Sequence, residues 1–271
     1  MGSVVAFISL KGGVGKTTIS AALGADLANR HGKKVLLVDA NYSAPNLGIH
    51  VDILSPNKTI HDVLNGVKLS DAIHSKHGLD VVPGNFFYIR GFNPLKLKSK
   101  LAYARKQYDF VILDTPPTLN DEMFSILYAA DEFFVVTTPD YPSLSGVMKL
   151  AKLSRHRGIN FAGIVVNRLS EPSLQLSLNE IQESTGIPVV STVHEDSSVM
   201  RSLFARAPVT LYSPSSRFSK DIGKLSAALI GLPEKKSLWN KIFRKSADKE
   251  AQNRESLRKH FYTSIFKDYR D

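Results

Sequence analysis

Short apolar runs alternate with stretches of helical periodicity up to about residue 230 of the chain. The apolar runs are rich in β-branched residues, which predicts central strands that are covered on both faces of a sheet. Strands are expected at 4–9, 34–39, 79–83, 110–114, 133–137, 162–167 and 188–192. Helices are expected at 18–30, 95–105, 121–129, 142–155, 174–185, 197–205 and 217–230.

This alternation predicts an α/β fold, in which a doubly wound, mainly parallel sheet is flanked by helices and binds ligands at the carboxyl ends of its strands. The 271 residues are enough for one such domain over 1–233, followed by a tail. The chain has no cysteine, which excludes disulfides, thiolate metal sites and iron–sulfur clusters.

A glycine-rich motif joins the first strand to the first helix. It reads Lys11-Gly12-Gly13-Val14-Gly15-Lys16-Thr17-Thr18. Such a turn exposes backbone N–H groups at a helix N-terminus, where the helix dipole favours an anion. Lys16 can reach the terminal phosphates of a nucleotide, and the Thr17 hydroxyl can ligate Mg²⁺. The motif therefore predicts a phosphate-binding loop.

Two later strands are expected to end beside this loop. The strand at 110–114 ends in Asp114, whose carboxylate can hold Mg²⁺ through water beside Thr17. The strand at 34–39 ends in Asp39, and Asn41 follows two residues later. The Asn41 side chain can orient a water molecule, but an amide is not a usable base near neutral pH.

The motif KGGVGKTT resembles the deviant Walker A motif of the MinD/ParA family of ATPases, because Lys11 adds a second lysine at the start of the loop. In that family this lysine reaches across a dimer interface to the nucleotide of the other subunit. The resemblance covers about residues 3–230. It implies a P-loop NTPase fold of the deviant Walker A type, ATP and Mg²⁺ as cofactors, and a homodimer when ATP is bound.

The resemblance also assigns roles to residues. Asp114 corresponds to the Walker B carboxylate, and Asp39 and Asn41 lie in switch I. Many members have Asp at the position of Asn41, so slow hydrolysis is expected. Asn167 is the expected adenine ligand, and Glu195 is expected near the base. The expected catalytic set is Lys11, Lys16, Asn41 and Asp114, the Mg²⁺ set is Thr17, Asp39 and Asp114, and the nucleotide set is Gly12, Gly13, Val14, Gly15, Lys16, Thr17, Thr18, Asn167 and Glu195.

The tail after Pro233 is denser in positive charge than the rest of the chain. Residues 234–271 hold 11 basic and 6 acidic side chains, in a protein of net charge +10. Residues 234–245 form a basic amphipathic pattern typical of an interfacial membrane anchor, a role that a short C-terminal helix has in MinD relatives. The alternative is packing on the domain. The expected membrane-contacting residues are Lys235, Lys236, Leu238, Trp239, Lys241, Ile242, Phe243, Arg244 and Lys245.

Two further segments are compatible with more than one role. A polar linker at 246–256 is expected to precede a second amphipathic helix at 257–269, marked by Leu257, Phe261, Ile265 and Tyr269. That helix is compatible with packing on the domain, with membrane contact and with binding a partner. The aromatic segment 86–92 is a possible docking loop, although packing in the core is favoured.

These patterns predict a MinD-like ATP-dependent switch that binds an anionic membrane surface and positions other proteins, as in division-site or surface-structure placement. Its activator or cargo protein is not identified by the sequence. The alternatives are a ParA-like ATPase that binds DNA nonspecifically and a nonhydrolysing ATP-bound scaffold. A strand begins near residue 4, and no apolar run approaches about 18 residues. The expected location is therefore cytoplasmic, at the inner face of the cell membrane.

Overall fold

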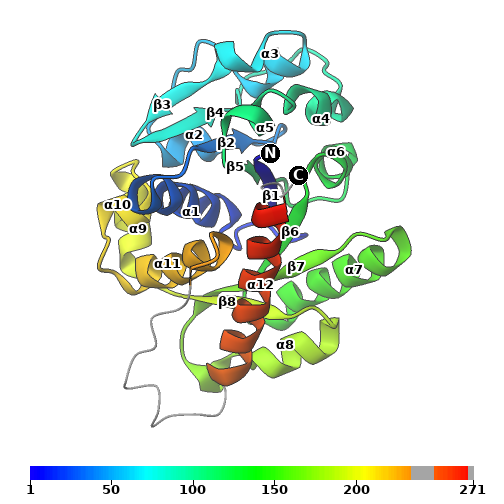
Figure 1. The fold of residues 1–271 in the computed structure, drawn as a ribbon, viewed down its shortest axis with the longest axis vertical. Helices are drawn as coiled ribbons and strands as arrows, with labels where there is room; N and C mark the ends of the chain where they lie inside the picture. Colours follow the sequence, from blue (N-terminus) through cyan, green and yellow to red (C-terminus); the bar gives the residue numbers. More distant parts are fainter. Residues whose placement is uncertain (233–246, 268–271) are drawn as a thin grey trace.

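The computed structural model describes residues 1–232 and 247–267 (Figure 1). One sheet of eight strands, in the order β3-β4-β2-β5-β1-β6-β7-β8, forms the centre of the molecule. The strands are β1 Ser3–Ile8, β2 Val35–Asp39, β3 His74–Lys76, β4 Leu79–Val82, β5 Phe110–Asp114, β6 Glu132–Thr137, β7 Phe161–Leu169 and β8 Val189–His194. All neighbours pair in parallel except β3 and β4. The predicted doubly wound, mainly parallel sheet is confirmed.

Helices cover both faces of this sheet (Figure 1). The α-helices are α1 Lys16–His31, α2 Leu47–His50, α3 Ile60–Leu64, α4 Leu97–Lys100, α5 Ala104–Gln107, α6 Asp121–Ala129, α7 Tyr141–Arg157, α8 Leu178–Thr185, α9 Ser197–Phe204, α10 Val209–Tyr212, α11 Arg217–Leu229 and α12 Ala247–Lys267. Short 3-10 turns are η1 Leu69–Ala72, η2 Pro94–Lys96 and η3 Pro172–Leu174.

Strand side chains alternate between two hydrophobic cores. In β1, Val4, Ala6 and Ile8 enter the core that includes α6 and α7. Val5 and Phe7 enter the opposite core, which includes α1 and α11. Because both faces of each central strand are buried, the near-continuous apolar runs in the sequence are explained.

The helix predicted at 95–105 is wrong as a single helix. The structure divides this stretch into η2, α4 and α5. The Ala102 N–H donates to the Ser99 carbonyl oxygen at 3.4 Å, a 3-10 type bond that interrupts the α-helical ladder. The helix predicted at 174–185 begins only at Leu178, because the Ser177 side chain caps its N-terminus and accepts from the Glu180 N–H.

The C-terminal helix α12 starts at Ala247, so the expected linker at 246–256 is helical from that residue onward. The helix packs on β8 and α11, on the same side of the sheet as α1 (Figure 1). Leu257 and Phe261 are buried there. The sequence left packing on the domain, membrane contact and partner binding open for this helix. The structure shows packing on the domain for Leu257 and Phe261.

The polar side chains of α12 bind the edge strand β8. The Thr192 N–H donates to Glu250 at 3.2 Å, and Arg254 donates to the Val190 carbonyl oxygen at 3.2 Å. Asn253 donates to the Val189 carbonyl oxygen at 2.9 Å. An edge strand otherwise presents unpaired backbone groups, so this polar stretch covers the edge of the sheet.

The predicted membrane anchor at 234–245, including all its basic and apolar residues, lies outside the described residues. Within 1–232 and 247–267, no helix is both long enough and apolar enough to cross a membrane.

Candidate functional site

The loop between β1 and α1 has the backbone of an anion site. Gly13 and Gly15 adopt φ values of 75° and 97°, a region that residues with a Cβ atom rarely adopt. A Cβ atom on Gly15 would also lie 2.2 Å from the Asn167 side-chain nitrogen. The 16-residue helix α1 has no side-chain cap at its N-terminus, so its first N–H groups are available to a phosphate.

The two lysines of the loop differ in exposure. Lys16 is only 7% exposed, and burial lowers the pKa of its ammonium group although Asp114 opposes the shift. The Lys11 side chain is 42% exposed, and its Nζ lies 3.1 Å from Asp140 and 2.9 Å from the Ser143 hydroxyl. Lys16 therefore faces the interior of the site, whereas Lys11 is accessible from outside.

Asp140 is the N-cap of α7. Partial burial raises its pKa, but hydrogen bonds from Thr138, Ser143 and Lys11 outweigh burial and lower the pKa to about 2. The carboxylate that holds Lys11 is therefore ionised throughout the physiological pH range.

Asp39 and Asp114 stand side by side, because β2 and β5 pair in register at these residues. Both are fully buried. Burial, followed by repulsion from Asp114, raises the pKa of Asp39, and burial raises the pKa of Asp114 although Thr17 and Lys16 oppose the shift. Two adjacent buried carboxylates are a costly arrangement without a cation.

The oxygen atoms of these residues fit a hard cation. Thr17 donates to Asp114 Oδ2 at 2.7 Å, while Asp114 Oδ1 is buried and has no hydrogen-bond partner among the residues that the structure describes. Asp39 instead accepts the N–H groups of Asn41 and Leu47, at 3.2 and 3.0 Å. Thr17 and Asp114 therefore offer ligand oxygens to Mg²⁺, and Asp39 also holds the switch I backbone.

Asn41 is buried, and its side-chain N–H group donates to the Ala44 carbonyl oxygen at 2.6 Å. The neighbouring Ser43 hydroxyl donates to the buried Glu122 carboxylate. Glu122 lies in the first turn of α6, after the segment that follows β5. Switch I is therefore bonded to α6. Sequence analysis missed Glu122, because an acidic residue in a first helical turn is most simply explained by the helix dipole.

Two histidines also hold switch I and were missed. The His50 Nδ1 lies 3.0 Å from the Asn46 carbonyl oxygen, and its Nε2 lies 3.4 Å from the Thr18 hydroxyl. The buried His61 bonds the Tyr42 carbonyl oxygen through Nε2 at 3.0 Å. Single histidines without a metal-ligand spacing gave no signal in the sequence.

The two residues expected near the base lie at strand ends. Asn167, at the end of β7, donates to the Val14 carbonyl oxygen at 2.8 Å and so contacts the phosphate-binding loop directly. Glu195 is exposed just after β8, and its N–H donates to the Leu169 carbonyl oxygen at 3.0 Å. Their roles in binding adenine remain predictions.

Comparisons with known proteins agree with this geometry. A family model described as an AAA domain matches residues 2–157. An uncharacterized ATP-binding protein of Methanocaldococcus jannaschii is 32% identical over 235 residues, which is 85% of this chain and 89% of that protein. A ParA family protein of Chlamydia muridarum is 30% identical and covers 84% of this chain and 97% of its own.

Among solved structures, the septum site-determining protein MinD of Pyrococcus horikoshii, complexed with Mg-ADP, has a TM-score of 0.76 and 28% identity. The match covers 83% of this chain and 95% of that protein. The septum site-determining protein MinD of Thermotoga maritima is 26% identical over 85% of this chain and 89% of its own length. The phosphate-binding loop, the paired aspartates and these relatives lead to one conclusion: the chain belongs to the MinD/ParA family of P-loop ATPases.

Proposed function

We propose that this protein is a MinD-like switch that binds ATP with Mg²⁺, dimerises around the nucleotide, attaches to an anionic membrane and positions another protein. The observation that carries the proposal is the pair of lysines in one loop. Lys16 is buried beside Asp114, whereas Lys11 is half exposed at the N-terminus of α7. One lysine is thus placed for the nucleotide of its own subunit, and the other is accessible to a partner.

The roles of the residues follow from their positions. The backbone N–H groups of the loop and Lys16 bind the phosphates. Thr17 and Asp114 would hold Mg²⁺, which neutralises phosphate charge when bound. The side-chain carbonyl oxygen of Asn41 orients the attacking water, while its side-chain nitrogen donates to the Ala44 carbonyl oxygen. Lys11 leaves Asp140 and stabilises phosphate charge in the partner subunit.

Hydrolysis is tested by Asn41→Asp. A carboxylate accepts a proton more readily than an amide, so the rate of phosphate release should rise several-fold under saturating ATP. The matched control is Asn46→Asp, a neighbouring asparagine in the same loop. An equal or lower rate for Asn41→Asp would show that this position does not limit turnover. No phosphate release from either protein would favour the nonhydrolysing scaffold.

Membrane attachment is proposed from the sequence of 234–245. The location proposed with it is the inner face of the cell membrane. A truncation at residue 233 is a poor test, because it also deletes Leu257 and Phe261 from the core. The substitutions Trp239→Gln and Phe243→Gln in the full chain remove two large apolar side chains from 234–245 and keep the net charge. Ser237→Gln with Asn240→Gln is the matched control.

Flotation with phosphatidylglycerol vesicles, with ATP and with ADP, measures this attachment. Two weak anchors in one dimer bind with avidity, so ATP should increase vesicle binding of the unmodified protein. The Trp239→Gln, Phe243→Gln protein should lose at least tenfold, and the control should not. Equal binding by both variants would overturn the anchor at 234–245.

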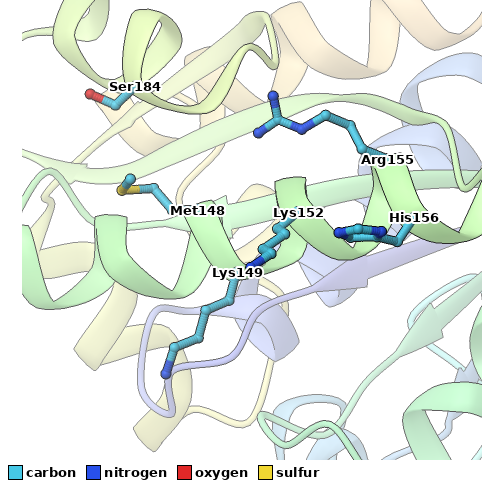
Figure 2. Close-up of a pocket in the computed structure, with 6 residues that line it drawn as sticks. All are labelled: Met148, Lys149, Lys152, Arg155, His156 and Ser184. Atoms are coloured by element: carbon cyan, nitrogen blue, oxygen red, sulfur yellow. The ribbon is translucent and has the colours of Figure 1, made fainter.

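A second candidate function is nonspecific DNA binding, as in the ParA-like alternative. Its support is an open cavity of about 580 Å³ beside α7 and α8 (Figure 2). The cavity is lined by Met148, Lys149, Lys152, Arg155, His156 and Ser184. Several cationic side chains along one helix suit a phosphate backbone, whose binding is sequence-independent and sensitive to salt.

Fluorescence anisotropy with a random duplex tests this candidate. Lys149→Gln with Lys152→Gln should weaken binding and reduce the salt slope of log K by about 2 if each lysine neutralises one phosphate. Lys58→Gln with Lys68→Gln removes two exposed lysines elsewhere and serves as the control. Identical affinities for the two double variants would exclude the α7 face as a DNA site.

A further inference from the structure

The segment between β4 and α4 presents apolar side chains to solvent. Phe86, Phe87 and Ile89 are 64%, 86% and 96% exposed. The sequence had favoured core packing for this aromatic stretch, which is wrong for these three residues. They form what we call the apolar tip, defined as Phe86, Phe87 and Ile89. Three large, strongly exposed apolar side chains within four consecutive residues are a feature that requires an explanation.

The inward-facing part of the segment, which we call its base, is held in place by contacts with the domain. Tyr88 and Phe92 turn inward and contact the buried His61, with ring centroids 4.5 and 5.2 Å apart. The Asn85 N–H donates to His61 Nδ1 at 3.2 Å, and Asn65 donates to the Gly91 carbonyl oxygen at 3.2 Å. The inward rings therefore hold the apolar tip outward, so its exposure follows from packing at the base.

The base is also joined to switch I. Phe92 contacts Tyr42 with ring centroids 5.4 Å apart, and His61 bonds the Tyr42 carbonyl oxygen. A Cβ atom on Gly84 would lie 2.2 Å from Pro45 and 3.5 Å from the Asp39 carboxyl carbon. The segment thus leaves the sheet at the carboxyl end of β4, which is the same edge that holds the phosphate-binding loop (Figure 1).

The stretch of sequence that contains the apolar tip carries charge of one sign. Residues 81–108 contain six basic and no acidic side chains. Arg90 and Lys96 are exposed, and no ion pair joins either to another residue in the part of the chain that the structure describes. Leu95 adds a further exposed apolar side chain. Aromatic and aliphatic side chains beside uncompensated cations are the composition of surfaces that enter the interface of an anionic bilayer.

We propose that the apolar tip is a second membrane contact, which inserts Phe86, Phe87 and Ile89 into an anionic lipid surface while Arg90 and Lys96 bind headgroups. The contact rests on the membrane attachment proposed above but uses different residues. A protruding tip suits a deformable lipid interface, and its cations select anionic lipids. Lipid contact would thereby occur at the nucleotide edge of the domain, next to switch I.

Tryptophan fluorescence separates this proposal from the anchor at 234–245. The chain has a single tryptophan, Trp239, so the native protein reports on the anchor. Phe87→Trp in a Trp239→Phe background reports on the apolar tip, and the 86% exposure of Phe87 leaves room for the larger ring. Both proteins are mixed with phosphatidylglycerol vesicles and with phosphatidylcholine vesicles, in ATP and Mg²⁺.

A blue shift of the Phe87→Trp protein on phosphatidylglycerol, but not on phosphatidylcholine, is the expected result. A shift at Trp239 without one in the Phe87→Trp protein would overturn the second contact and leave the anchor. A shift in the Phe87→Trp protein alone would support the second contact and remove the anchor. The absence of both shifts would overturn both proposals.

Flotation of a triple variant supplies an independent measurement. Phe86→Ser, Phe87→Ser and Ile89→Ser together should lower the vesicle-bound fraction at least fivefold. The matched control replaces three comparably exposed apolar residues elsewhere, Leu174, Met200 and Phe204, which are 82%, 59% and 85% exposed. The ATP-dependent dimer fraction without lipid should be unchanged in the tip variant. Its loss would assign the apolar tip to the interface with a second copy and overturn the lipid contact.

Discussion

Charged side chains are buried both at the carboxyl end of the sheet, where Asp39 and Asp114 lie, and at the contact between α12 and β8. We call the first region the nucleotide edge. The two regions differ in whether the buried charges have partners of opposite sign. At α12, Glu250 accepts from the Thr192 N–H and pairs with Arg254, which also donates to the Val190 carbonyl oxygen. At the nucleotide edge, two carboxylates repel one another and Asp114 Oδ1 has no partner in the described chain. Buried polar groups are normally satisfied.

The difference separates a contact in which opposite charges pair within the chain from one in which like charges are brought together. Opposite charges and backbone groups compensate each other at α12. Like charges are held together at Asp39 and Asp114 by the strand register, and the raised pKa of each reports the cost. Such perturbed groups beside an anion-binding loop are typical of functional sites.

Phe261→Ala would break the α12 contact most severely. Phe261 is buried and stacks on Phe134 with ring centroids 6.5 Å apart. A buried Phe→Ala change costs about 3–5 kcal/mol, so the free energy of unfolding in urea should fall by that amount. Phe204→Ala, at an exposed site, should change it by less than about 0.5 kcal/mol. Equal losses would show that α12 is not part of the core.

Lys16→Ala removes the buried cation of the phosphate-binding loop at the nucleotide edge. Lys16 would form a buried charge pair with the phosphates of ATP, and truncating one partner of such a pair costs about 2–5 kcal/mol. The Kd for ATP should therefore rise by about 100-fold or more in calorimetric titration. ATP-dependent dimerisation should be lost with it. Lys11→Ala is the control, because it should keep ATP binding and lose the dimer. Unchanged ATP affinity in Lys16→Ala would contradict the assignment.

Asp114→Asn sharpens the comparison because it removes a buried charge that Thr17 and Lys16 compensate only in part. Without Mg²⁺ and nucleotide, Tm should rise by about 2–4 °C, the shift expected for about 1 kcal/mol in a domain of this size. Added Mg-ATP should raise the Tm of the unmodified protein more than that of the variant. A lower Tm in the variant without ligand would show that the carboxylate is compensated after all.

The difference in Tm between Asp114→Asn and the unmodified protein should change with pH in a direction that the pKa of Asp114 sets. Burial raises the folded-state pKa of Asp114 above its unfolded value, so the folded state binds the proton more tightly. The stability linked to this proton is present below the unfolded pKa of about 3.9. It is lost as the pH rises through the folded pKa. The Tm gap between Asp114→Asn and the unmodified protein should therefore widen as the pH rises from 4.

Asp140→Asn gives the smallest expected effect. Asn is as good an N-cap for α7 as Asp, and a half-exposed ion pair contributes less than about 1 kcal/mol. Stability should hardly change, but Lys11 loses its charged partner and becomes freer to reach a second subunit. Sedimentation velocity with ATP should show a dimer that is tighter by a few-fold. A weaker dimer would mean that Asp140 positions Lys11 for the interface.

The sequence determined the sheet, most of the long helices and the centre of the site. Buried parallel strands give continuous apolar runs, and a phosphate-binding loop requires glycines and a lysine at fixed spacing. These are local patterns, so residues 11–18, Asp39 and Asp114 could be identified without coordinates. The short helices α2, α3 and α10 and the edge strand β3 were missed, because segments of a few residues show no readable period.

Only the tertiary structure decided which distant groups meet. Lys11 and Asp140 are 129 positions apart, and Ser43 and Glu122 are 79 apart. The exposure of the apolar tip and the burial of α12 were likewise open, because an amphipathic or aromatic pattern specifies a face but not what covers it. Periodicity is a property of neighbouring residues in the chain, whereas burial and partner choice are set by the packing of the whole fold.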